Sequence, residues 1–155
     1  MLTVFLTIAM MQSPDTQFDF WVGDWELTGK SRNSPGKDEF TETKAKNSIN
    51  KILNGKVIQE NFSMTGFNGK SWTAYNPTTK KWKQTWVDDS GAYLLFDGGM
   101  EAEGMTLHLT NGAPGTKMRM TFREVKKDSF KWLWQRSTDE GKTWETQWEL
   151  NYRRK

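Results

Sequence analysis

The stretch FDFWVGDWELTG, residues 18–29, gathers aromatic side chains at the start of a chain that is otherwise polar. Four aromatic residues lie within it around Gly23, and from Trp25 onwards apolar and polar residues alternate. Alternation with a period of two is typical of a β-strand that buries one of its faces. The stretch therefore predicts a short aromatic segment that leads directly into a first strand.

The same alternation continues to the end of the chain, and helical periodicity is nearly absent. Turn sequences such as NPTTK and NGAPG interrupt it at intervals of roughly 8 to 12 residues, which is typical of an antiparallel sandwich or barrel. About ten strands joined by short hairpins are too many for one flat sheet, so we predict an all-β fold, a single up-and-down antiparallel β-barrel. The predicted strands cover residues 25–31, 40–47, 56–64, 70–75, 81–87, 92–97, 105–110, 117–125, 129–136 and 143–153.

The composition indicates how such a barrel would fill its core. The 155 residues are enough for one domain, which we place over residues 14–155. Hydrophobic residues make up only 35% of the chain, but it contains nine Trp and nine Phe. The buried apolar area must therefore come from a few large rings. Such a composition suits strands better than a helical bundle.

Charge and cysteine content exclude several classes of function. The net charge is +3, but basic and acidic residues are interleaved and form no block, so we expect no nucleic-acid partner. The absence of cysteine excludes disulfides, thiolate metal sites and cysteine nucleophiles. With a single histidine, a protein-ligated zinc site is not expected either, and the sequence predicts neither a metal nor a cofactor.

The first 13 residues, MLTVFLTIAMMQS, form a separate apolar segment. The run is too short to span a membrane stably but has the length of the core of a secretory signal. No Lys or Arg precedes the run, and no cleavage triplet of small residues follows it. Three interpretations of residues 1–13 stay open: a signal peptide, with a periplasmic or secreted protein, an extra strand, or a disordered apolar tail. A cytoplasmic location is compatible with the last two.

The alternation also assigns an inward face to the predicted strands. In the last strand Trp144, Thr146, Trp148, Leu150 and Tyr152 share one face, which we predict to point inward. A barrel of about ten strands is wider than side chains fill easily, so an inward lining of rings predicts an apolar cavity. The predicted cavity lining consists of Trp72, Trp82, Gln84, Trp86, Met118, Met120, Phe122, Trp132, Trp134 and Trp148, with Gln84 to orient a ligand.

The triplet Gly23-Asp24-Trp25 resembles the G-x-W opening of lipocalins and other members of the calycin superfamily. In that superfamily the Trp seals the closed end of the barrel and an Arg from the last strand lies across its ring. Arg153 and Arg154 are the two candidates for that Arg in this chain. The resemblance implies a short N-terminal helical plug, in which Phe18, Phe20, Trp21, Gly23, Trp25 and Arg153 are the predicted structural residues.

A closer resemblance covers nearly the whole chain from Phe18 onwards. The blocks FDFWVGDWE, GKSWTAYNPTTKKWKQTWVDDSG and STDEGKTWETQWELNYRRK, in this order, are similar to a bacterial domain family of unknown function. Its members open with FDFWxGxW and are thought to form a lipocalin-like barrel. The resemblance implies the fold and a general expectation of ligand binding, but no activity or catalytic residue.

Taken together, these observations predict a protein that binds a small hydrophobic or aromatic molecule in a Trp-lined cavity. Two alternatives stay open: an enzyme that acts on a small hydrophobic substrate in the same cavity, and a protein-interaction module whose barrel is solid. An enzyme would need a carboxylate or His108 inside the cavity with a shifted pKa. His108 alternates with Leu107 and Leu109 and is predicted to face outward, with a haem ligand or a general base as its alternative roles. Glu60, Asp97, Glu103 and Arg119 are charged residues on strands, and no spacing forces any two of them together.

Overall fold

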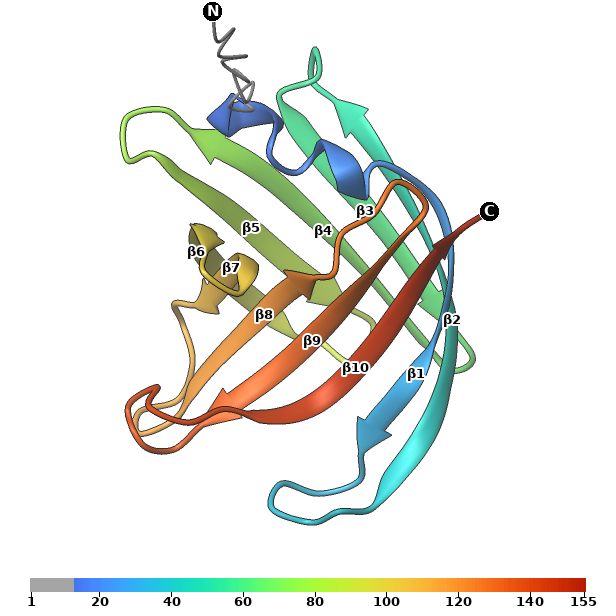
Figure 1. Cartoon of the computed structure of the whole chain (residues 1–155), viewed down its shortest axis with the longest axis vertical. Helices are drawn as coiled ribbons and strands as arrows, with labels where there is room; N and C mark the ends of the chain where they lie inside the picture. Colours follow the sequence, from blue (N-terminus) through green and yellow to red (C-terminus); the bar gives the residue numbers. More distant parts are fainter. Residues whose placement is uncertain (1–12) are drawn as a thin grey trace, which may run out of the picture.

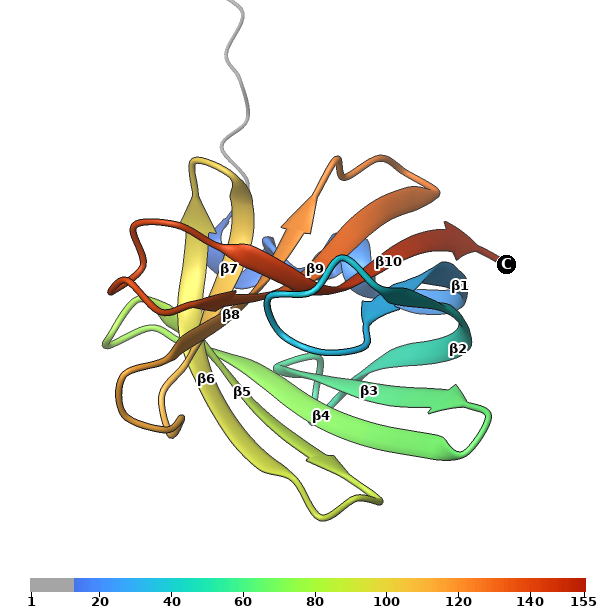
Figure 2. The same ribbon diagram turned by 90° about the horizontal axis from the view of Figure 1, so that it is seen from below.

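Ten antiparallel strands form a closed barrel in the computed structural model, which describes residues 13–155 (Figure 1). Each strand pairs with its neighbours in sequence, and β1 pairs with both β2 and β10, which closes the ring (Figure 2). The predicted up-and-down barrel is therefore confirmed. The strands are β1 (Gly23–Arg32), β2 (Phe40–Ile52), β3 (Val57–Met64), β4 (Phe67–Asn76), β5 (Lys81–Asp88), β6 (Tyr93–Glu101), β7 (Gly104–Leu109), β8 (Lys117–Arg123), β9 (Ser129–Ser137) and β10 (Glu145–Arg154).

Strand β6 continues beyond the point where the sequence predicted a break. The predicted strand ended at residue 97, but Gly98 and Gly99 both pair with β7. A Cβ at Gly98 would overlap the main-chain carbonyl of Thr106 on the neighbouring strand. Here the glycine permits close approach of two strands and does not form a turn.

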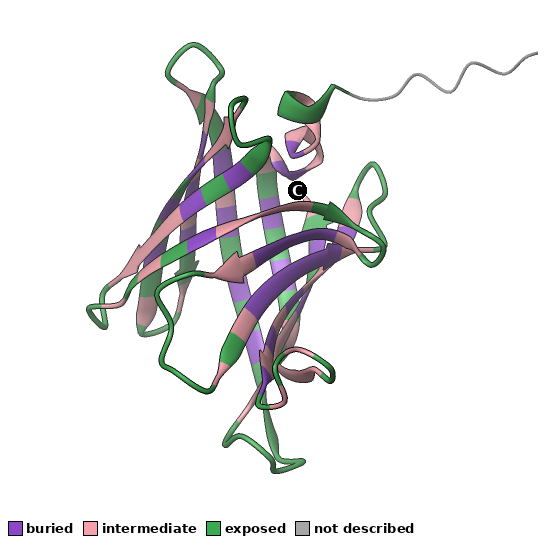
Figure 3. Cartoon of the chain, turned by 90° about the vertical axis from the view of Figure 1, so that its left-hand side faces the viewer, coloured by how far each residue is buried: buried purple, intermediate pink, exposed green. Residues whose placement is uncertain are grey.

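Two short 3₁₀ turns, η1 (Pro14–Thr16) and η2 (Asp19–Trp21), lie across one end of the barrel (Figures 1 and 3). The Phe18 ring packs between Trp82 and Phe122, with ring centroids 5.0 and 5.1 Å away. Phe18 and Trp21 are almost completely buried. The predicted N-terminal plug is therefore present, and it fills the barrel end at which β1 begins.

Trp25 holds this plug in place beneath an arginine from β10. Its indole N–H donates to the carbonyl oxygen of Trp21 at 2.9 Å, and its ring packs on Phe130. The guanidinium over the Trp25 ring, at 4.2 Å from the centroid, belongs to Arg154. The choice of Arg153 was wrong, because strand alternation from the buried Tyr152 brings Arg154 to the same face and turns Arg153 outward.

Gly23 has a specific reason to be glycine in this arrangement. Its φ of +137° lies in a region that other residues rarely adopt, and a Cβ there would overlap the Arg154 guanidinium. Arg154 passes this point to donate to the carbonyl oxygen of Val22 at 3.0 Å. Gly23 leaves room for the Arg154 guanidinium, and Trp25 provides the ring on which it lies, so both residues of the triplet are needed for this contact with β10.

Buried residues alternate with more exposed ones along β1, β2, β3 and β4, whereas β7 and β8 bury consecutive residues (Figure 3). Strand β10 departs from this pattern, because its pairing with β9 shifts between Thr146 and Trp148. A bulge of one residue reverses the faces on its two sides. Trp144 and Thr146 were therefore wrongly predicted to point inward: Trp144 packs against the guanidinium of Arg119, and Thr146 accepts a bond from Gln135 outside the barrel.

Over residues 13–155, no helix is long and apolar enough to cross a bilayer. The apolar run that was interpreted as a signal peptide or a tail lies outside the described residues, apart from its last residue, Ser13.

Candidate functional site

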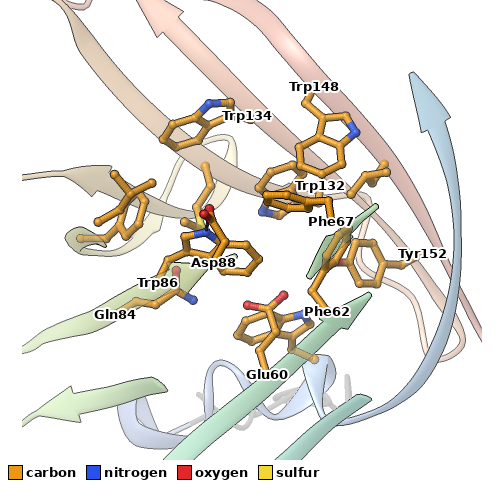
Figure 4. Close-up of a pocket in the computed structure, with 15 residues that line it drawn as sticks. Glu60, Phe62, Phe67, Gln84, Trp86, Asp88, Trp132, Trp134, Trp148 and Tyr152 are labelled. Atoms are coloured by element: carbon orange, nitrogen blue, oxygen red, sulfur yellow. Dashed lines mark hydrogen bonds between the residues drawn. The ribbon is translucent and has the colours of Figure 1, made fainter. Parts of the chain in front are cut away.

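A cavity of about 190 Å³ occupies the half of the barrel opposite the plug (Figure 4). Trp21 of the plug forms part of its wall, and so do the start of β4 and the end of β5. An apolar protein cavity of about 150 Å³ can hold one benzene molecule, so this volume suits a molecule with a single ring. The wall consists of Trp21, Glu60, Phe62, Phe67, Gln84, Trp86, Asp88, Leu94, Phe96, Met120, Trp132, Trp134, Trp148, Leu150 and Tyr152.

Several rings of the aromatic wall meet at steep angles, while Phe67 and Trp86 stack at an interplanar angle of 25°. Phe62 packs edge-on against Trp86 and Trp148, with interplanar angles of 65° and 84°. Trp132 meets Trp148 at 88°. These rings come from different strands and line the cavity, where their faces and edges can contact a ligand.

Glu60 is a carboxylate buried in this apolar wall. Its neighbours on the inward face of β3 are Ile58 and Phe62, and it is 6% exposed. The side-chain amide of Asn47 donates to Oε1 at 2.6 Å, and the hydroxyl of Ser71 donates to Oε2 at 2.6 Å. Burial raises the pKa of Glu60 to about 6, although both hydrogen bonds act in the opposite direction. The carboxyl group therefore changes its protonation state near pH 6 and is mostly ionised at neutral pH.

Tyr152 extends this polar network across the barrel to β10. The Asn47 amide that donates to Glu60 also donates to the Tyr152 hydroxyl at 3.0 Å. Burial raises the pKa of Tyr152 well above its ordinary value, and the nearby Glu60 carboxylate adds to the effect. The hydroxyl therefore keeps its proton and remains a neutral hydrogen-bond donor.

Gln84 presents to the cavity a polar atom that has no partner in the described part of the chain. The amide nitrogen donates to the Thr73 hydroxyl at 2.9 Å, which fixes the orientation of the side chain. The amide oxygen is buried and accepts no hydrogen bond within the described residues. A buried acceptor without a partner costs free energy, so this oxygen favours a ligand that can donate to it.

Asp88, at the end of β5, is the second carboxylate of the wall. One oxygen accepts the Trp86 indole N–H at 2.8 Å and so fixes the orientation of that ring. The other accepts from the main-chain N–H of Ser90 and of Ala92 and holds the turn to β6. Partial burial opposes ionisation, but the hydrogen bonds from Ser90, Trp86 and Ala92 together hold the pKa of Asp88 below its ordinary value.

Strand β4 turns its small residues inward, which corrects the prediction for Trp72. Trp72 is 38% exposed and lies outside the barrel, while Ser71 and Thr73 face the interior. A Cβ at Gly69 would overlap the ring of Trp86. This face is small and polar because it must accommodate that ring and bond to Glu60 and Gln84.

The structure separates the predicted lining into residues that reach the cavity and residues that do not. Trp82 and Phe122 point inward but pack on Phe18 of the plug, which fills that end of the barrel. Met118 is only partly buried, lies one inward position beyond Met120 and is not part of the wall. Those that line the cavity are Gln84, Trp86, Met120, Trp132, Trp134 and Trp148.

The other charged residues that were considered lie away from the cavity. Asp97 pairs with Lys81. Glu103 lies in the turn between β6 and β7, not on a strand, and its carboxylate accepts from Arg119 at 2.7 Å. His108 faces outward as predicted and is 2.7 Å from the Glu101 carboxylate. In the described part of the chain, no three His, Asp or Glu side chains gather as a metal ion would require.

Glu60 is the residue that the sequence interpretation undervalued. It was named only as a charged residue on a strand, although the alternation of β3 places it between Ile58 and Phe62 on what is otherwise an apolar face. That alternation was the available signal, because a charge between two buried apolar residues of one face must itself point inward. The neighbours that hold it, Asn47 and Ser71, come from other strands, and only the pairing register brings them close.

A closed ten-stranded up-and-down barrel, plugged at one end and hollow in the other half, is consistent with the lipocalin-like class of β-barrels. Residues 12–154 match the family described as protein of unknown function (DUF1579), and the chain belongs to this family. The comparison with curated proteins finds no match. The predicted membership of a domain family of unknown function is thus confirmed.

Proposed function

We propose that this protein binds a small hydrophobic or aromatic molecule in the cavity of its barrel. The observation that carries the proposal is the cavity of about 190 Å³, whose wall contains Trp86, Trp132, Trp134 and Trp148. Cavities lined by apolar rings with a few polar groups are the usual form of small-molecule sites. The volume favours a ligand of one ring over a long-chain lipid, and the hollow interior argues against the solid barrel of the interaction-module alternative.

The binding proposal predicts that truncation of a wall ring weakens binding of a neutral aromatic probe. We expect Trp132→Ala to weaken the binding of phenethyl alcohol by about 1 to 3 kcal/mol, because the ligand loses apolar contact area. Tryptophan fluorescence and isothermal titration calorimetry would measure the affinity. Trp72→Ala is the matched control, because it removes the same side chain from the outside of the barrel and should leave the affinity unchanged. Equal affinities of the two variants, or no binding to the native protein, would contradict the proposal.

A second candidate is an enzyme that acts on a substrate in the same cavity, and Glu60 is the observation that favours it. A buried carboxylate whose pKa is about 6 can accept a proton at neutral pH, as a general base must. In that case the native protein should exchange an acidic C–H of a bound ketone such as phenylacetone for deuterium from D₂O, because Glu60 removes the proton and a deuteron from the solvent replaces it, and Glu60→Gln should not. NMR spectra of probe and protein over days would show the exchange, and an unchanged probe at full occupancy would favour binding alone.

A further inference from the structure

The charge of the cavity wall is opposite in sign to that of the protein. Among the 15 described residues of the wall, Glu60 and Asp88 are acidic and none is Lys, Arg or His. The chain as a whole carries 22 basic and 19 acidic residues. The negative wall therefore does not follow from the overall composition, and it disfavours an anionic ligand.

Within residues 13–155, Glu60 has no cationic partner, although a buried carboxylate usually has one. Its hydrogen-bond partners within the described residues are Asn47 and Ser71, which are both neutral. Elsewhere in this protein a buried charge is paired, as Arg119 is with Glu103 at 2.7 Å. Removal of an ion from water is costly unless an opposite charge compensates it. A cationic ligand would supply that charge.

The rings of the wall favour the same kind of ligand. The face of an indole attracts a cation through its quadrupole, most strongly when water is excluded. Trp86, Trp132 and Trp148 surround the space above Glu60, and Trp134 lies further along the same wall (Figure 4). An ammonium group near Glu60 would thus have aromatic groups around it and a carboxylate beside it.

The free oxygen of Gln84 adds an independent requirement. Gln84 is 3% exposed, and its amide nitrogen is already bonded to Thr73. The remaining oxygen, which has no partner in the described structure, can only accept a hydrogen bond. An N–H donor on the ligand would satisfy it, whereas a hydrocarbon or a carboxylate would not.

From these features we infer that the ligand is a small organic cation, an ammonium group attached to a single apolar ring. Its N–H groups donate to the Glu60 carboxylate and the Gln84 amide oxygen, and its ring lies among the tryptophans. The inference rests on the proposed function and adds the charge and the donor character of the ligand to it.

Three probes with the same phenyl-ethyl skeleton separate charge from shape: phenethylamine, phenethyl alcohol and hydrocinnamate. At pH about 7.5, where Glu60 is ionised, we expect the native protein to bind the ammonium at least about tenfold more tightly than the alcohol. The carboxylate should bind most weakly. Calorimetry of each probe with the same protein preparation would give the ratios.

Two variants link the preference to Glu60. In Glu60→Gln the ammonium should lose its advantage over the alcohol, while the alcohol should still bind. Glu42→Gln, the same change at an exposed position of β2, should leave both affinities as they are. A preference that survives in Glu60→Gln would overturn the role of Glu60.

The native protein provides a second measurement that does not depend on the folding of a variant. When the pH is lowered from about 7.5 to about 5, Glu60 becomes neutral and the ammonium preference should fall. The other titratable groups of the wall are Asp88, whose pKa is lowered, and Tyr152, whose pKa is raised, so neither changes charge in this interval.

The outcomes distinguish the inference from the proposed function. If the alcohol binds as tightly as the ammonium, or the carboxylate binds best, the inference is overturned and binding in the cavity stands. If none of the three probes binds at millimolar concentration, both are overturned.

Discussion

Replacement of Trp25 by alanine is expected to lower the free energy of unfolding by about 3 to 5 kcal/mol, as truncation of a buried aromatic residue does. Trp25 is 1% exposed and packs against Phe130 and Tyr152. Its loss would leave a void between the plug and the barrel, and the Trp21 carbonyl would lose its indole donor. Urea unfolding followed by far-UV circular dichroism would measure the change without relying on the tryptophan signal.

Trp72→Ala is the control for this experiment. Trp72 lies outside the barrel, so the same truncation should cost about 1 kcal/mol or less. The Trp72 variant also tests the correction made to the sequence interpretation, which placed Trp72 in the cavity. Equal losses of stability in the two variants, or a small loss in Trp25→Ala, would show that Trp25 does not secure the plug.

The period of two in the sequence was sufficient to predict the strands and their closure into a barrel. It divides a strand into two faces, but it identifies the inward face only when one of the faces is clearly apolar. Strand β10 from Trp148 to Tyr152 meets this condition. Strand β4 does not, because Trp72 competes with a face made of Gly69, Ser71 and Thr73. The inward residues of β4 are small because of side chains on β3 and β5, and those contacts are not encoded within β4 itself.

The candidate site was less predictable than the fold, because it depends on distances along the barrel axis. Trp82 and Trp86 lie on the same face of the same strand, and the sequence gives no reason to treat them differently. The plug separates them: Trp82 packs on Phe18, while Trp86 lines the cavity. How deeply the plug enters the barrel is set by packing between segments far apart in the chain. A bulge such as the one between Thr146 and Trp148 likewise leaves no clear signal in a single sequence.

Burial of Glu60 affects both the candidate site and the stability of the barrel. It presents the carboxylate charge to a ligand, and it lowers the stability of the folded protein when no ligand is bound. A ligand cation would offset part of that cost, and the free energy involved would contribute to selectivity for the cation. A functional group that reduces the stability of the unliganded protein is a common feature of binding sites. The pH dependence of stability measures this cost directly.

Glu60→Gln is expected to become more stable relative to the native protein as the pH rises from about 4 to about 7.5. The pKa of Glu60 is about 6 in the folded state against an ordinary value of 4.5, so the folded protein holds this proton more tightly than the unfolded chain. Its contribution to stability is present below about pH 4.5 and is lost as the pH rises past 6, a change of about 2 kcal/mol. Gln does not titrate, so the difference in unfolding free energy between variant and native protein should grow by that amount.

Urea unfolding at a series of pH values, without ligand, would test this. Other acidic groups with lowered pKa values, such as Asp88 and Asp139, are common to both proteins and cancel in the difference. Glu42→Gln removes one negative charge from an exposed site of β2 and controls for the change in net charge. A difference between Glu60→Gln and native protein that stays constant over this range would mean that Glu60 ionises as easily inside the barrel as in the unfolded chain. The cavity would then offer a ligand no uncompensated charge, and its electrostatics would not favour a cation over a neutral molecule.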